Sequence, residues 1–217
     1  GEYCEIDPSR VVDSELYVVP SQPATYFGSD NALIASPRID NLAGCYTVME
    51  ALAAAKPGDR VQMAVFFDHE EIGSRTTTGA ASSLISETLQ RIAFSPGSAE
   101  GGAGQGAYAQ LLSRTVLVSN DGAHARHPSF ADKHDAGYAP KLGGGPAVKK
   151  SAIRRYATEL PVTAWVFSAA RRSGLPLQIL QNRSDLPAGS TIGPALASLL
   201  SVPTIDLGIP MLSMHST

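Results

Sequence analysis

The chain has 217 residues, of which 43% are hydrophobic and 17% charged, and its net charge is −3 at pH 7. This composition is typical of a globular protein with a sizeable apolar core, and it lacks the overall basic charge that favours nucleic-acid binding. No apolar run approaches the ~20 residues that cross a bilayer, so we expect neither nucleic-acid nor membrane contacts. Two cysteines, Cys4 and Cys45, are interpreted as thiols of a reducing compartment, which predicts a cytoplasmic location.

Hydrophobic periodicity divides the sequence into alternating strands and helices. Strands are predicted, in chain order, at 16–19, 60–67, 115–118, 177–180 and 203–208. Helices are predicted between them at 42–55, 82–92, 161–173 and 195–200. The glycine-rich stretch 94–106 is predicted to be a mobile surface loop. The alternation of the two element types predicts an α/β layered domain with a central, largely parallel sheet.

Four ionisable residues, Asp68, His69, Glu70 and Glu71, follow directly after the predicted strand at 60–67. The end of an apolar strand is where open α/β sheets place ligands and chemistry. Two adjacent carboxylates can take different tasks there, since one can bind a cation while the other stays free as a general base. The alternative is a solvated turn whose acidic residues lie near a helix N-terminus.

Other polar residues follow predicted strands or precede predicted helices, among them Asp40, Asp121 and His215. With the paired glutamates they make a plausible ligand set for Zn²⁺, Mn²⁺ or Co²⁺. Each residue also has an ordinary explanation. Asp40 can cap the following helix, Asp121 can belong to a turn before Gly122, and His215 can be a surface residue near the chain end. The residues alone leave both interpretations open.

Seven blocks of sequence, taken together, are more specific than any single motif. They are 36–42 (SPRIDNL), 68–74 (DHEEIGS), 119–128 (SNDGAHARHP), 145–149 (GPAVK), 155–158 (RYAT), 189–194 (GSTIGP), and 206–208 with 212–216 (DLG and LSMHS). In content and order these blocks resemble the family-18 metalloaminopeptidases, the aspartyl aminopeptidase group. The resemblance implies a layered αβα zinc-peptidase domain with a mixed, largely parallel central sheet.

The resemblance also implies a role for each matching residue. Asp40 would bridge two zinc-type ions, and Glu71 and His215 would complete the shell of one of them. Asp121 would bind the other ion, and Glu70 would be the general base that takes a proton from the bridging water. Four positions match residues that lie near the substrate in the family, namely His124, Lys149, Tyr156 and Met214. Asp68 matches a position behind the metal ligands, where it would orient one of them. By charge, Lys149 would pair with an acidic substrate side chain, and the alternative is a surface lysine beside Lys150.

The resemblance further predicts that the chain is part of a longer protein. In the family, the first ligand histidine lies upstream of an inserted dimerisation domain, and no histidine precedes Ser36 here. We expect residues 1–24 to be the segment that re-enters from that insertion and 25–217 to be a partial catalytic domain. The second ion site, Asp40 with Asp121, would then lack its imidazole and be weakly occupied or empty.

The function that follows by resemblance is a dinuclear-metal aminopeptidase that hydrolyses the N-terminal residue of peptides, with acidic residues as the first expected preference. Zn²⁺ is the expected metal, two ions per active site in the full protein, with Mn²⁺ or Co²⁺ as alternatives. The expected partners are peptide substrates and further copies of the chain, by resemblance in a dodecamer. Two alternatives stay open: a catalytically defective fragment or assembly subunit of such an enzyme, and a related metal-dependent deacylase or carboxypeptidase.

Overall fold

The computed structural model describes residues 6–95 and 105–216. Most of the glycine-rich stretch that we predicted to be a mobile loop lies outside these described residues. The chain separates into two compact units, with the first 37 residues in one and residues 38–216 in the other. Every residue that the sequence marks as a candidate for chemistry belongs to the second unit.

The first unit contains little regular structure. It holds a 3-10 helix, η1 (Pro8–Arg10), and an antiparallel pair of strands, β1 (Thr25–Phe27) and β2 (Leu33–Ala35), separated by η2 (Ser29–Asn31). The predicted strand at 16–19 is not formed. Its apolar residues fit a strand locally, but among residues 6–95 and 105–216 no strand pairs with it, and a strand is stable only within a ladder.

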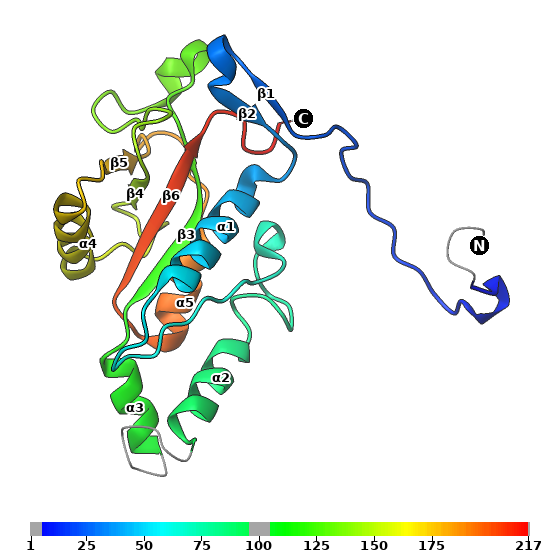
Figure 1. Ribbon diagram of the computed structural model, residues 1–217, viewed down its shortest axis with the longest axis vertical. Coiled ribbons are helices and arrows are strands. Elements are labelled where there is room, and N and C mark those ends of the chain that lie inside the picture. The colour runs from blue at the N-terminus through cyan, green and yellow to red at the C-terminus, as the bar shows by residue number, and fades with distance from the viewer. Residues whose placement is uncertain (1–5, 96–104, 217) are drawn as a thin grey trace. The chain divides into compact units, whose positions relative to one another are not determined.

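A four-stranded mixed sheet forms the centre of the second unit (Figure 1). The strands are β3 (Leu117–His124), β4 (Ala147–Lys150), β5 (Gln178–Gln181) and β6 (Thr204–Met211), in the spatial order β3-β6-β4-β5. β3 runs parallel to β6 and β4 runs parallel to β5, whereas β4 and β6 are antiparallel. The prediction of a mixed, largely parallel sheet is therefore confirmed.

Helices cover both faces of this sheet. Three helices contact its strands, namely α1 (Ile39–Ala54), α4 (Leu160–Arg172) and α5 (Ile192–Leu200). Two more, α2 (Leu84–Ala93) and α3 (Gln105–Ser113), pack against each other, and η3 (Glu70–Ile72) and η4 (Pro128–Lys133) are short 3-10 turns. Successive strand residues point to opposite faces, so Ile205 packs against α4 while Asp206 meets the first turn of α5. This arrangement makes an αβα layering. Among the helices of residues 6–95 and 105–216, none is long and apolar enough to cross a membrane.

The predicted strand at 60–67 is not formed, which is the main difference from expectation. Within the described chain, no backbone hydrogen bond joins residues 61–67 to another segment. Val65 and Phe67 pack against the core between α2 and α5, but Val61 and Phe66 are 66% and 48% exposed. The residues have strand propensity and lack a strand partner. Because they end at Asp68, this segment nevertheless carries the acidic stretch to the edge of the sheet.

Candidate metal centre

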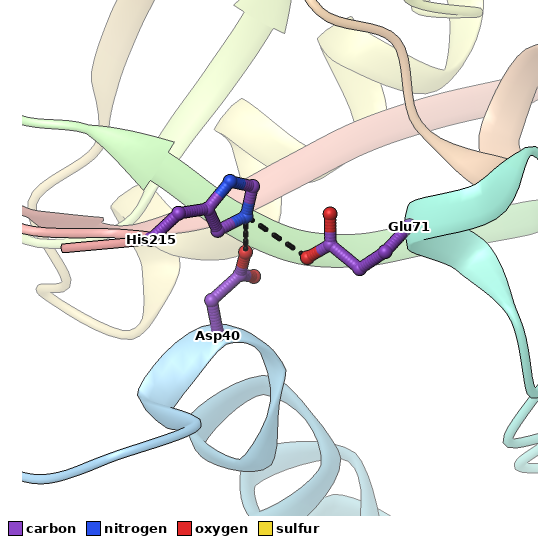
Figure 2. A group of neighbouring side chains, drawn as sticks. All are labelled: Asp40, Glu71 and His215. Carbon is purple, nitrogen blue, oxygen red and sulfur yellow. Dashed lines mark hydrogen bonds and ion pairs between the residues drawn. The ribbon is translucent and has the colours of Figure 1, made fainter. Parts of the chain in front are cut away.

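Three side chains from distant parts of the chain meet at one point, as Figure 2 shows. Asp40 comes from the start of α1, Glu71 from η3, and His215 from the segment after β6. The His215 Nε2 atom lies 3.0 Å from Asp40 Oδ2 and 2.9 Å from Glu71 Oε1. One potential ligand atom from each residue lies within 4.8 Å of the others. Two carboxylates and one imidazole around a shared point are ligands that suit Zn²⁺.

The two adjacent glutamates, Glu70 and Glu71, lie in one tight turn but in different surroundings. His69 (φ 59°) and Gly73 (φ 99°) both adopt left-handed conformations and enclose the single turn of η3. Within this turn Glu71 joins the cluster with His215, whereas Glu70 is not one of the three clustered residues. The preceding residue Asp68 accepts a hydrogen bond from the His69 N–H, and its own carboxylate is 70% exposed. No described contact joins Asp68 to Asp40, Glu71 or His215.

The carboxylate of Asp40 has one oxygen that lacks a partner. Its side chain is 6% exposed, and Oδ2 faces His215, but the buried Oδ1 has no hydrogen-bond partner. Gly122 leaves this oxygen room, because a Cβ at position 122 would lie 2.8 Å from it. A buried carboxylate oxygen without a donor is costly, and a cation beside it would remove that cost. Among the described hydrogen bonds Asp40 accepts none from a backbone N–H, so the capping explanation finds no support.

The strand continues past its predicted end at 118, so Asp121 lies within β3, paired with Gly208, rather than in a turn, and it faces a buried lysine from β4. Lys149 is 3% exposed, and its Nζ lies 3.5 Å from Asp121 Oδ2 and 5.5 Å from the ring centre of Tyr156. Gly208 accommodates the lysine stem, since a Cβ there would lie 2.8 Å from Lys149 Cε. Burial raises the pKa of Asp121 above its ordinary value, and the positive charge of Lys149 opposes that rise. Lys149 is therefore not the surface lysine that its neighbour Lys150 suggested.

Glu70 has the most clearly perturbed carboxyl group of this region. Burial, followed by the negative charges of Asp121, Glu71 and Asp40, raises the pKa of Glu70 to about 7. A carboxyl group with a pKa near neutrality is suited to accept and return a proton at physiological pH. Glu70 lines the same cavity as the three clustered residues without belonging to the cluster, so its carboxyl group is free for another role.

A single cavity of about 600 Å³ collects these side chains. Nine of the ten predicted site residues line it, namely Asp40, Glu70, Glu71, Asp121, His124, Lys149, Tyr156, Met214 and His215. Asp68 is the exception. Burial, followed by the charge of Lys149, lowers the pKa of His124, which favours the neutral imidazole. The cavity also exposes lining residues that we did not predict, chiefly Arg75, Ser190 and Thr191. The matched block 189–194 pointed to the last two, but gave no reason to place them at a site.

Comparisons with known proteins point to one family. Residues 1–217 match the model of the family described as aminopeptidase I zinc metalloprotease (M18). A "Probable M18 family aminopeptidase 2" of Mycobacterium leprae is 39% identical over 194 residues, which are 89% of this chain and 44% of that protein. The protein of the same name from Pseudomonas putida is 39% identical over 212 residues, 98% of this chain and 47% of the relative. The chain thus spans less than half the length of these curated relatives.

Solved structures of related chains show the same fold. An M18 aminopeptidase from Thermotoga maritima superposes with a TM-score of 0.79 at 30% identity, covering 91% of this chain and 44% of that one. A chain in the cryo-EM structure of the Ape4 and Nbr1 complex reaches a TM-score of 0.87 at 35% identity, covering 99% of this chain and 41% of that one. The fold of this chain is therefore one already known in aminopeptidases.

Proposed function

The chain belongs to the M18 family of zinc metallopeptidases, and we propose that it carries the catalytic centre of an aminopeptidase that releases the N-terminal residue of peptides. The observation that carries the proposal is the cluster of Asp40, Glu71 and His215, which has ligand atoms in reach of one ion. The partner-free Oδ1 of Asp40 supports it, because a cation would satisfy that oxygen. Zn²⁺ is the first choice of metal from the donor types, with Mn²⁺ and Co²⁺ as alternatives.

The side chains divide the work of hydrolysis between them. Asp40, Glu71 and His215 would hold the ion, which supplies Lewis acidity for the scissile carbonyl and lowers the pKa of water. Glu70 accepts the proton of the attacking water as the new C–O bond forms. It then delivers that proton to the leaving amine as the C–N bond breaks. Burial and the neighbouring carboxylates raise the pKa of Glu70, and a bound cation would lower it again toward the ionised form that accepts a proton.

We propose that Asp40 is also able to bridge two ions, because its two oxygens have different surroundings. Oδ2 faces His215, whereas Oδ1 is buried without a partner on the side of Gly122, next to Asp121. The second position would draw on Asp40 and Asp121, with no imidazole in reach among the described residues. Lys149 already contacts Asp121 and opposes a further positive charge there.

We therefore expect the isolated chain to bind one ion tightly and a second ion at least 100-fold more weakly. A first site with three protein ligands is favoured over one with two carboxylates beside an ammonium group. Zinc titration followed by isothermal calorimetry, with elemental analysis after dialysis, measures both the number of ions and their affinities. Two tightly bound ions per chain would contradict this expectation.

The proposed substrate preference rests on Lys149. Its buried ammonium group lies at the cavity and has Asp121 as its anionic partner. In the full protein, a cation at Asp121 would occupy that carboxylate and leave the ammonium group of Lys149 free for an acidic substrate side chain. We accordingly propose acidic N-terminal residues as the preferred substrates.

Turnover of Asp-linked and Leu-linked chromogenic amides, with added Zn²⁺, Mn²⁺ or Co²⁺, tests the proposed function directly. Hydrolysis of the amides that carry a free α-amine, with a preference for the Asp-linked one, supports it. Hydrolysis restricted to N-blocked substrates would favour a deacylase or carboxypeptidase instead, because an aminopeptidase requires the free α-amine. No turnover with any metal would favour a catalytically defective fragment or an assembly subunit.

We also propose that residues 25–217 are one part of a catalytic domain and that residues 1–24 lead into it from an insertion. The rest of that catalytic domain would cover an apolar face on α1. Leu42, Tyr46 and Met49 recur at helical spacing on α1 and are 59%, 63% and 57% exposed. The unpaired segment 61–67 likewise offers strand-forming residues without a partner. More than half of the length of the curated relatives lies outside the stretch matched here, and this is the part that we propose as the cover.

This apolar face on α1 predicts that the chain on its own associates or binds hydrophobic dyes. Replacing Met49 by glutamate should lower both the dye fluorescence and the apparent mass in solution, because the charge interrupts the exposed apolar surface. Glu50→Gln, on an exposed neighbouring residue of the same helix, is the matched control. An unchanged dye signal in Met49→Glu would argue against an accessible apolar face.

One structural neighbour is described as the S. cerevisiae mApe1 dodecamer, with a TM-score of 0.71 at 28% identity. From this likeness we propose that the full protein forms a homo-oligomer of the same kind. The cytoplasm remains our proposed location, consistent with Cys45 as a free thiol.

A further inference from the structure

A completely buried carboxylate, Asp206, lies on β6 outside the metal cluster. Its side chain has no solvent exposure. Oδ1 accepts a hydrogen bond of 2.7 Å from the Thr191 hydroxyl, and Oδ2 accepts one of 2.6 Å from the Ala157 N–H. A buried charge is tolerated only when such bonds satisfy it, so both donors must stay in place in the folded protein.

One of the two donors belongs to the start of α5. Thr191 is the N-cap residue of this helix, and its hydroxyl oxygen also accepts a hydrogen bond from the Gly193 N–H. Gly193 allows the close approach, because a Cβ at this position would lie 2.4 Å from Asp206 Oδ1. The negative charge therefore lies where the helix dipole favours an anion. Asp206 fixes the first turn of α5 and, with it, the neighbouring Ser190.

The other donor belongs to the segment that carries Tyr156. Besides the bond from Ala157, the Asp206 N–H donates to the Thr158 hydroxyl oxygen, which in turn donates to the backbone carbonyl of Lys149. Lys149, Tyr156 and Ser190 all line the cavity, and together we call them the substrate wall. The described bonds of Asp206 reach this wall from both sides, and none of them reaches Asp40, Glu71 or His215.

We propose that Asp206 is a positioning residue that holds the substrate wall in register with the metal cluster. It does so by tying the start of α5 to the segment 156–158 through one buried carboxylate. The substrate role of the wall rests on the function proposed above. When these hydrogen bonds are weakened, recognition of an acidic substrate at Lys149 should suffer, while metal binding by Asp40, Glu71 and His215, which none of these bonds reaches, should not.

The test uses substitutions that remove one bond with little change of shape. Thr191→Val removes the hydroxyl that donates to Asp206, and Asp206→Asn removes the charge. Thr191→Ser restores a hydroxyl and should rescue the first variant. Thr163→Val is the structural control, because Thr163 is 5% exposed and donates to the Glu159 carbonyl, away from Asp206.

In Thr191→Val and Asp206→Asn we expect KM for the Asp-linked amide to rise about tenfold or more, as for a lost hydrogen bond to a charged group. The KM for the Leu-linked amide and the zinc affinity should change less than about threefold. Amide hydrogen exchange at Ala157 and Gly193 should accelerate in these two variants and not in Thr163→Val. Equal losses on both amides, or a parallel loss of zinc affinity, would overturn the positioning role.

Hydrogen exchange separates this inference from the proposed function. If the unaltered chain hydrolyses neither amide, the aminopeptidase proposal fails for the chain by itself. The positioning role of Asp206 is then judged from the amide hydrogen-exchange rates alone. Faster exchange confined to residues 156–158 and 190–193 in Thr191→Val supports it, and exchange rates equal to those of the unaltered chain overturn it.

Discussion

Replacing Glu70 by glutamine should lower kcat by about 10²–10⁴-fold and leave the bound zinc unchanged. Glutamine has nearly the same size and shape as glutamate, but its amide cannot take a proton from the attacking water. Glu70 lies outside the cluster of Asp40, Glu71 and His215, so its loss should remove proton transfer without removing a ligand. Steady-state kinetics with the chromogenic amides and elemental analysis of the same samples measure the two quantities.

Two further variants complete this test of Glu70. Glu50→Gln makes the same chemical change on the exposed surface of α1 and should keep full activity. Glu70→Asp keeps a carboxylate but shortens the side chain, so it should retain more activity than Glu70→Gln and less than the unaltered protein. If Glu70→Gln retained full turnover in the presence of metal, the proton would have to be accepted by another group, and the assignment of Glu70 would be wrong.

The fold could be predicted where local pattern and final environment agree. Leu42, Tyr46 and Met49 repeat at helical spacing, and α1 forms as expected. The same residues lie exposed, because periodicity identifies the apolar face of a helix but not what covers it. The segment 61–67 shows the opposite case. Its residues favour a strand, yet a strand also requires a partner ladder, and the described chain provides none.

The sequence predicts which residues lie at the candidate site better than it predicts the contacts between them. The sequence placed Asp40, Asp121 and His215 beside the ends of predicted elements, and the cavity brings the three together, although β3 continues through Asp121. The different positions of Glu70 and Glu71 depend on left-handed backbone at His69 and Gly73; a glycine favours that conformation, but local propensity does not predict it for a histidine. The role of Asp206 depends on partners 15 and 49 residues away in the chain, Thr191 and Ala157, so it becomes visible only in three dimensions.

Replacing Glu71 by alanine should abolish tight metal binding, in contrast to the change at Glu70. The substitution removes one of only three ligands in the cluster and leaves Asp40 and His215 to bind the ion. Since the loss of an outer partner of a ligand already costs 10- to 100-fold in affinity, we expect a loss of at least about 100-fold here. Turnover should disappear with the metal and return in part at high zinc concentration.

Thermal unfolding with and without zinc provides a readout that does not require activity. A ligand at 100 times its dissociation constant stabilises the folded state by about 2.7 kcal/mol, so zinc should raise the Tm of the unaltered chain by several degrees. Glu70→Gln should keep this response, and Glu71→Ala should lose it. The two residues are adjacent and chemically identical, so each variant serves as the matched control for the other. Equal loss of the zinc response in both would mean that the turn at η3 does not separate a proton acceptor from a ligand, and the proposed division of roles would fail.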